Sequence, residues 1–274
     1  MIARRIDEGS LKLPTPSASA TRVLQLLRRD DIDPRSVARA VEKDPLLAAQ
    51  IIRMANTLAF RRTGTTSSLN DAVVRLGTRQ LKSFLVAAVA FELFISHDRE
   101  IDDAVSAIRA HSVAVSLLAR DLAYIIRCDQ VEEAYLTGLF HDIGKVVVMV
   151  FVLEVLRSQS TYHRTLHIDK QDYMEAIRLL GARVGAMLVS QWELAPDLEG
   201  LIRESRYFNV TARVSVGNLV CFANAMTKKM GLSFGDQRHQ EVQATVIVGR
   251  SILGLDEEVV ERVCVGLDQR VKEI

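Results

Sequence analysis

Apolar residues recur at helical spacing along most of the chain, and breaks in this pattern mark where helices begin and end. A first helix is predicted around Val23–Leu27. Two more are expected to begin at Asp33-Pro34 and Asp44-Pro45, because an aspartate at the N-cap followed by a proline in the first turn is a helix start signal. The chain therefore opens with short helices.

The apolar pattern then becomes denser. Ser68 and Asp71 resemble a capping box, with aspartate in place of the preferred glutamate, and open a short helix that Gly77 is expected to end. The following helix, Arg79–Ile95, is apolar over most of its surface and is expected to be central.

A change of composition divides the chain. Charged residues replace the apolar pattern over Ser96–Glu100, which predicts an N-terminal unit of residues 1–97 and a C-terminal unit of residues 98–274. Helical spacing resumes over Asp102–Ile126. The block Val146–Leu153 is continuous enough to be a buried strand, but its neighbours favour a helix.

The last third of the chain is also helical. Tyr173–Trp192 is predicted to be a long helix, in which Gly181 and Gly185 permit close backbone approach. Four later helices are predicted. A short one begins at Pro196, a long one is capped by Thr211 and runs to Met230, and two more cover residues 237–252 and 256–271. The predicted fold class is all-α.

Composition narrows the classes of function. The chain has 274 residues, of which 49% are hydrophobic and 25% charged, as expected for a globular protein. Its 35 lysines and arginines nearly balance its 34 aspartates and glutamates, leaving a net charge of +1. A nucleic-acid partner usually requires a basic excess, so none is expected.

Cysteine spacing and hydropathy predict the compartment. Cys128, Cys221 and Cys264 are far apart and fit reduced thiols. We expect that no apolar run reaches the roughly 18 residues needed to span a bilayer; Phe84–Ile95 comes closest but contains Glu92. The N-terminus also lacks an apolar signal core. We therefore expect a soluble, cytoplasmic protein with no membrane partner.

The stretch Leu136–Val150, LTGLFHDIGKVVVMV, places two adjacent polar residues between core-forming segments. His141 and Asp142 can share one divalent cation through an imidazole nitrogen and a carboxylate oxygen. Alternatively, they satisfy each other and the carbonyl groups left where a helix ends at Gly144. The dipeptide alone does not decide between these interpretations.

Several segments in order carry a family resemblance: a Leu-Pro start, DPLLAAQIIRMANT, SSLNDAVVRLGTRQLKSFLVA, AHSVAVSLLARDLA and AYLTGLFHDIGKVVV. Together they resemble the HDOD domain, a bacterial regulatory relative of the HD phosphohydrolases, over roughly residues 13 to 230. The resemblance implies an N-terminal bundle of about five helices packed on a C-terminal bundle related to the HD domain.

In catalytic HD proteins, a histidine, the HD pair and a later aspartate bind metal. The resemblance matches His111 to the first histidine and His141 with Asp142 to the pair, but the later aspartate corresponds to Asn224. Asparagine offers only a neutral carbonyl oxygen to a hard cation. Lys145, as in active relatives, is placed to meet a phosphate, although capping helix-end carbonyls would explain it equally well.

The chain also lacks the residues that bind a second metal ion in related HD proteins. The histidines that complete a dinuclear centre in related proteins are missing near Gly181–Gly185 and at Glu204-Ser205-Arg206. His163, His167 and His239 are predicted to lie on exposed connections and not to be ligands.

These features favour a non-catalytic signalling module with no cofactor. His111, His141, Asp142 and Asn224 would form a buried cluster that fixes how helices meet, and such a cluster must be satisfied internally. Function would lie in the groove between the two bundles and in the loop with Arg61 and Arg62, which could meet an acidic partner or a phosphate. The expected partner is a separate signalling protein, and a homodimer is possible.

Two alternatives remain open. A phosphohydrolase or phosphodiesterase would hold one weakly bound iron, manganese or zinc ion at His111, His141, Asp142 and Asn224, with Lys145 on the phosphate.

A sensor of cyclic dinucleotides would instead bind phosphates without hydrolysing them. Arg61, Arg62, Arg203 and Arg206 could supply the guanidinium groups.

Overall fold

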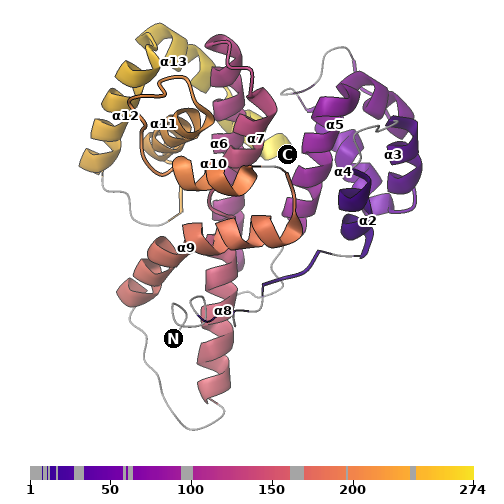
Figure 1. Cartoon of the computed structure of the whole chain (residues 1–274), viewed down its shortest axis with the longest axis horizontal. Coiled ribbons are helices and arrows are strands. Elements are labelled where there is room, and N and C mark those ends of the chain that lie inside the picture. Colours follow the sequence, from indigo (N-terminus) through magenta and orange to yellow (C-terminus); the bar gives the residue numbers. More distant parts are fainter. Residues whose placement is uncertain are drawn as a thin grey trace.

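The computed structural model describes residues 8, 11, 13–16, 18–27, 34–57, 60, 64–93, 101–160, 170–195, 197–234 and 239–274. Every regular element within these ranges is a helix, which confirms the all-α prediction. Figure 1 shows one group of helices, α2–α5, standing beside a larger group that contains α6 and α11–α13.

The first group packs around its longest helix, α5. Its members are α2 (Ala18–Leu27), α3 (Pro34–Val41), α4 (Pro45–Asn56) and α5 (Leu69–Leu93).

Two predicted helix caps are present in this group. The Asp44 carboxylate accepts a hydrogen bond of 3.1 Å from the Leu47 N–H, and the Ser68 hydroxyl accepts one of 3.3 Å from the Asp71 N–H. Asp33 lies outside the described residues, although α3 begins at Pro34 as predicted.

Gly77 ends the helical run that begins at Leu69, as predicted. Its backbone has φ 71° and ψ 169°, a non-helical conformation that glycine adopts at little cost, and the second helical run of α5 follows this kink. The apolar segment that follows Gly77 lies in the core, with Phe84 and Leu85 fully buried. Its prediction as a central helix is therefore confirmed.

The second group carries the HD motif. It contains α6 (Asp102–Ile125), α7 (Val131–Phe140), α8 (Ile143–Ser160), α9 (Lys170–Trp192), α10 (Leu198–Glu204), α11 (Val216–Lys229), α12 (His239–Leu253), α13 (Glu257–Cys264) and α14 (Leu267–Glu273). Helix α7 packs on α6 and α11 within this group and also on α5 of the first group.

The core is continuous between the two groups. The ring of Phe60 stands edge-on to Phe84 and to Tyr135 of α7, and the Trp192 indole N–H donates a 2.8 Å hydrogen bond to the Pro14 carbonyl. The predicted boundary at residue 97 lies outside the described residues and stays a prediction.

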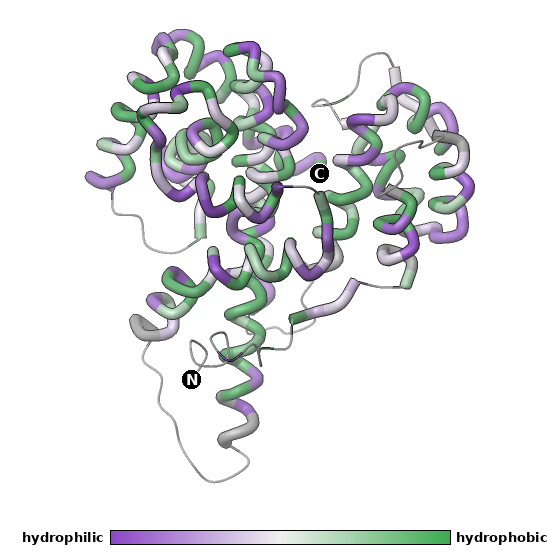
Figure 2. Tube along the Cα trace, in the orientation of Figure 1, coloured by the Kyte–Doolittle hydropathy of each residue, from purple (hydrophilic) through white to green (hydrophobic). Residues whose placement is uncertain are grey.

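The segment Val146–Leu153 belongs to α8, so the preference for a helix over a strand is confirmed. The longer stretch Val131–Val155 is apolar enough to cross a membrane, contrary to the expectation that no run reaches that length. Figure 2 shows its strongly hydrophobic character along α7 and α8. However, 78% of its most apolar window is buried inside the fold, as in a core helix.

The helix expected to end at Gly144 ends earlier. Helix α7 stops at Phe140, and α8 already begins at Ile143, so Gly144 lies in the first turn of a new helix. There α8 touches α9 through backbone: a Cβ atom at Gly144 would lie 1.9 Å from the Gly181 carbonyl oxygen and 2.2 Å from the Gly185 nitrogen. Gly144 is therefore required for close helix packing, and the predicted close approach at Gly181 and Gly185 is confirmed.

Two C-terminal predictions are wrong in detail. Thr211 lies in a bend, and α11 begins only at Val216, where Ser215 accepts a hydrogen bond from the Asn218 N–H. The Asn218 side chain donates to three carbonyl groups of the preceding loop and so holds that loop in a non-helical path.

The helix predicted over residues 256–271 is also divided, into α13 and α14. Gly266 has φ 69° and lies immediately before α14. A left-handed residue ends a helix, and glycine takes that conformation without steric penalty.

Gly144→Ala tests the α8–α9 contact. We expect it to lower the free energy of unfolding by at least about 2–3 kcal/mol, because its Cβ would overlap the backbone of α9, which cannot yield like a side chain. Urea unfolding followed by circular dichroism measures the change.

The matched control is Gly200→Ala in α10, where nothing lies within 4 Å of the added Cβ. Replacing this helical glycine should leave stability unchanged or raise it by up to about 1 kcal/mol. Equal effects in the two variants would contradict the proposed contact.

Candidate functional site

Three polar side chains meet where α6, α7 and α8 come together. His111 lies on the buried face of α6, while His141 and Asp142 form the turn between α7 and α8. Gly138 lets α7 approach α6, since a Cβ there would lie 2.7 Å from the Cα of Ser116. This close packing brings the turn against His111, so the three predicted residues lie together in the structure.

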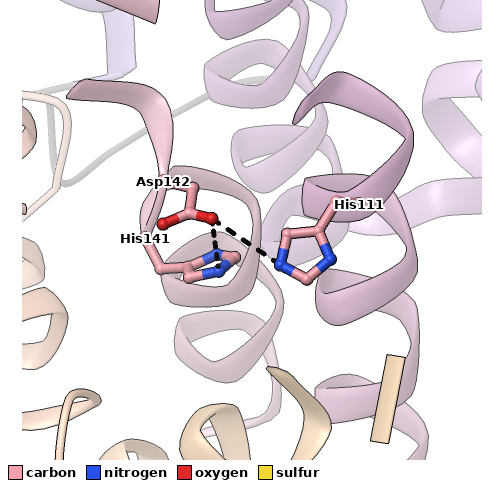
Figure 3. A group of neighbouring side chains, drawn as sticks. All are labelled: His111, His141 and Asp142. Atoms are coloured by element: carbon pink, nitrogen blue, oxygen red, sulfur yellow. Dashed lines mark ion pairs between the residues drawn. The ribbon is translucent and has the colours of Figure 1, made fainter. Parts of the chain in front are cut away.

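The cluster is compact and almost closed to solvent. His111, His141 and Asp142 are only 2%, 7% and 9% exposed. One Asp142 carboxylate oxygen, Oδ2, lies 3.4 Å from His141 Nε2 and 3.6 Å from His111 Nε2. Figure 3 shows the carboxylate above the two imidazole rings, with these contacts dashed.

Backbone carbonyl groups orient both imidazoles. His111 Nδ1 lies 2.7 Å from the Leu232 carbonyl oxygen, and His141 Nδ1 lies 2.7 Å from the Gly138 carbonyl oxygen. Because a carbonyl only accepts, each Nδ1 carries the proton. In the neutral rings, each Nε2 therefore presents a lone pair toward the centre of the cluster.

Asn224 of α11 completes the group. Its Oδ1 lies 3.1 Å from His111 Nε2, so the residue predicted to replace the metal-binding aspartate is at the site. The buried Thr227 hydroxyl lies 3.4 Å from His111 Nδ1 and bonds the Asn224 carbonyl at 3.0 Å. Among the described residues, His141 Nε2 has no hydrogen-bond partner.

Lys145 neutralises the carboxylate. Its ammonium group lies 2.6 Å from the same Oδ2 of Asp142 that faces the histidines. Burial alone would raise the pKa of Asp142, but the neighbouring His141 and Lys145 outweigh it and hold the pKa well below the usual range. Asp142 is therefore ionised at neutral pH, and Lys145 has a role other than capping helix-end carbonyls.

The histidines are held neutral. Burial lowers the pKa of His111 to about 3, although the Asp142 carboxylate opposes this shift, and burial lowers the pKa of His141 in the same way. Lys228, one helical turn after Asn224, is half-buried, and burial lowers its pKa while Asp142 raises it.

The donor set fits one divalent cation. Two imidazole nitrogens, a carboxylate oxygen and an amide oxygen are all ligand types for such ions. Two ligands held at about 2.1 Å by one tetrahedral ion are about 3.4 Å apart. The measured separations of 3.4 Å and 3.6 Å from Asp142 Oδ2 to the two imidazole nitrogens are of that size.

Other predicted residues lie away from this cluster. His239 is exposed at the start of α12, whereas Arg61, Arg62, His163 and His167 lie outside the described residues.

The remaining candidate arginines are on the surface. Arg203 donates from two nitrogens to Glu199 Oε1, at 3.2 Å and 2.7 Å, and the Arg206 guanidinium lies 5.9 Å from the Tyr207 ring centroid. The structure does not bring either of them to the HD cluster.

Sequence reasoning missed three contributors to the site. Lys228 and Thr227 follow Asn224 by four and three residues, a spacing that places side chains on one helix face. Extending the helix from Asn224 could have found both. The Leu232 carbonyl had no signal in the sequence, because it reaches His111 only after the chain turns back at Gly231.

Comparison with known proteins identifies this arrangement. The model of the HDOD domain family matches residues 13–207, most of the chain. An uncharacterized protein from Treponema pallidum (strain Nichols) is 23% identical over 206 residues, which are 74% of this chain and 38% of that protein. The chain thus spans well under half the length of that relative.

Solved structures share the fold. A candidate metal-dependent phosphohydrolase from Shewanella amazonensis SB2B is 21% identical with a TM-score of 0.80, covering 99% of this chain and 95% of that one. An HDOD domain protein of unknown function from Geobacter sulfurreducens is also 21% identical, with a TM-score of 0.69 and coverages of 99% and 96%.

A candidate signal transduction protein from Marinobacter aquaeolei VT8 is 23% identical with a TM-score of 0.62, covering 97% of this chain and 59% of that one. At these identities the likeness establishes the fold alone.

The buried histidines predict acid sensitivity. The folded-state pKa of His111 is about 3 and its unfolded value about 6.5, so the unfolded chain binds more protons in between. Stability should be greatest above pH 6.5 and fall as the pH drops toward 3, by about 1.4 kcal/mol per pH unit for one histidine. Guanidinium unfolding at several pH values measures this slope.

A matched pair of variants isolates the contribution of His111. His111→Asn should flatten the slope between pH 6 and pH 5, whereas His239→Gln, at an exposed position, should leave it unchanged. A wild-type profile that is flat across this range would contradict the neutral buried state.

Proposed function

Because the chain belongs to the HDOD domain family, we propose that it is a non-catalytic signal-transduction module that regulates a separate protein by direct binding. The observation that carries this proposal is the closure of the HD cluster. Its three central residues are only 2–9% exposed, and the Asp142 side chain 12%, so a phosphate ester reaches them only if the helices move. A hydrolase needs an open coordination position that substrate and water can reach.

The charges of the cluster support the same conclusion. Asn224 contributes no negative charge where a hydrolase would hold its metal with a carboxylate. Asp142 is the one carboxylate of the cluster, and its inward oxygen already pairs with the Lys145 ammonium. A cation entering the site would have to displace or repel that lysine.

The same contacts give the cluster a structural role. Asp142 belongs to the α7–α8 turn, Lys145 to the first turn of α8, His111 to α6 and Asn224 to α11. The hydrogen bonds from His111 Nδ1 to the Leu232 carbonyl and from Lys145 to Asp142 restrict how these helices can pack, because a shift would leave buried groups unsatisfied. The cluster would thereby fix how α6, α7 and α11 pack together, and so the shape of the surface that a partner would bind.

One observation favours a second candidate function, a metal-dependent phosphohydrolase. His141 Nε2 is buried without a hydrogen-bond partner among the described residues, and its lone pair points where a cation would sit. His111, His141, Asp142 and Asn224 would hold the ion, which would polarise a phosphate and activate water. The similar Shewanella protein is described as a candidate metal-dependent phosphohydrolase.

Removing His141 separates the two functions. In a structural cluster, His141→Ala should lower the free energy of unfolding by about 2–4 kcal/mol, because the Gly138 carbonyl loses its buried donor and the missing ring leaves a cavity. Neither wild type nor variant should hydrolyse bis-p-nitrophenyl phosphate with added manganese. A stable variant that has lost a measurable wild-type activity would establish the hydrolase instead, and His239→Ala serves as the surface control.

Asn224→Asp tests whether the missing charge disables metal binding. Without metal, this variant should be less stable than wild type, because a second carboxylate enters the buried cluster. Added manganese should raise its melting temperature, since binding to the folded state alone stabilises it. An equal manganese-dependent rise in wild type would show that the native site already holds metal.

A further inference from the structure

A groove of about 760 Å³ lies between the two groups of helices, away from the HD cluster. One wall belongs to α2 and α5, and the other to α7, α9 and α10 with the turn that joins α9 to α10. Figure 1 shows α7, α9 and α10 on the side of the larger group that faces α5. An occupant of this groove would touch both groups at once.

The two walls carry unlike charges. On the α5 wall lie two cations, Arg79 and Lys82. The opposite wall carries five carboxylates, those of Glu132, Glu133, Glu193, Asp197 and Glu199. The groove as a whole is therefore acidic, although the chain is nearly neutral.

Two of these carboxylates have an unused oxygen. Glu132 is only 7% exposed, and its Oε2 has no hydrogen-bond partner among the described residues. Glu133 Oε2 is likewise buried without a partner there. Both residues lie in the first turn of α7, where the helix dipole favours negative charge, but an unpaired buried carboxylate oxygen still carries a desolvation cost. Because these oxygens have almost no accessible surface, a donor reaches them only when the two walls of the groove move apart, and its binding then recovers this cost.

Burial raises the pKa of Glu132, although a hydrogen bond from Ser83 and the charge of Arg120 oppose the shift. A cation bound beside this carboxylate would favour its ionised form.

Apolar side chains lie between the charged walls. Leu24 and Val86 come from the first group of helices, and Leu136, Val189 and Leu194 from the second. Each of these residues is at most 7% exposed, so the apolar part of the lining is narrow, and aliphatic groups between the basic side chains of a peptide would match it.

We propose that this groove binds a basic amphipathic segment of the partner protein, with arginine side chains meeting Glu132 and Glu133 and aliphatic side chains covering the apolar floor. This inference rests on the proposed regulatory function and specifies the chemistry of the partner. Arginine suits the site because its planar guanidinium offers five donors and is weakly hydrated, so it pays less than lysine to enter a half-buried site. Binding would fix the position of the two groups of helices relative to each other.

The test uses the full chain and a defined probe. The probe is a fluorescein-labelled peptide of 16 residues that alternates leucine and arginine at helical spacing, with matched peptides carrying lysine or glutamate in place of arginine. Fluorescence anisotropy should show binding of the arginine peptide, about tenfold weaker binding of the lysine peptide and none of the glutamate peptide.

Substitutions on the two walls should act in opposite directions. Glu132→Gln with Glu133→Gln should weaken binding of the arginine peptide at least tenfold, whereas Arg79→Gln should tighten it severalfold by removing a competing cation. The matched control is Glu257→Gln with Glu258→Gln, an adjacent pair in the first turn of α13 that is exposed and outside the groove. This control should bind like wild type.

Thermal melting of the same variants gives a second measurement that needs no ligand. If the unpaired carboxylate oxygens serve binding and not the fold, the variant with Glu132→Gln and Glu133→Gln should have a melting temperature at or above that of the wild type. A lower melting temperature would show that they serve the fold instead and would overturn the proposal.

Two further outcomes would also overturn it: no binding of the arginine peptide, or equal binding to wild type and to both glutamate-pair variants. Either result leaves the non-catalytic role intact, because that role is judged by hydrolysis and metal content. Conversely, metal-dependent hydrolysis would refute the proposed function without changing the affinity of the groove for the peptide.

Discussion

The ionised carboxylate of Asp142, buried in the turn between α7 and α8, is the constraint on which the rest of the structure depends. A buried charge must be paired, and Lys145 supplies the countercharge at 2.6 Å while two imidazoles present neutral nitrogens beside it. This turn leads directly into α8, where Gly144 lets the helix pack against the backbone of α9. The paired buried charge and the close contact between α8 and α9 therefore lie next to each other in the chain.

The same constraint supports the regulatory role proposed for this enzyme-like cluster. Ligand-type atoms survive at the site, but burial, the neutral Asn224 and the ammonium of Lys145 all oppose metal-dependent hydrolysis. What the cluster retains is the ability to fix α6, α7 and α11 relative to one another. Helix α7 also packs on α5, so this rigidity extends to the acidic groove where the two groups of helices meet.

Much of the fold could be predicted from the sequence because the helices and their caps depend on residues close together in the chain. Caps at Asp44 and Ser68 involve residues three positions apart, and the helical period of α8 extends over its own length. The HD cluster was found because a family resemblance links His111 to Asp142 across α6 and α7. Two features could not be predicted in this way. The packing role of Gly144 depends on contacts with Gly181 and Gly185 far along the chain, and the Asn218 bonds that keep Thr211 out of α11 reach carbonyls five to nine residues back, beyond the spacing of a helix cap.

The central claim is that the HD cluster has a structural role and holds no metal. The most direct test is metal content by mass spectrometry, on protein purified without chelator or a nickel affinity step, beside His141→Ala. We expect folded wild-type protein with far less than one equivalent of iron, manganese or zinc. Near-stoichiometric metal that is lost in the variant would contradict the account and assign the cluster to catalysis.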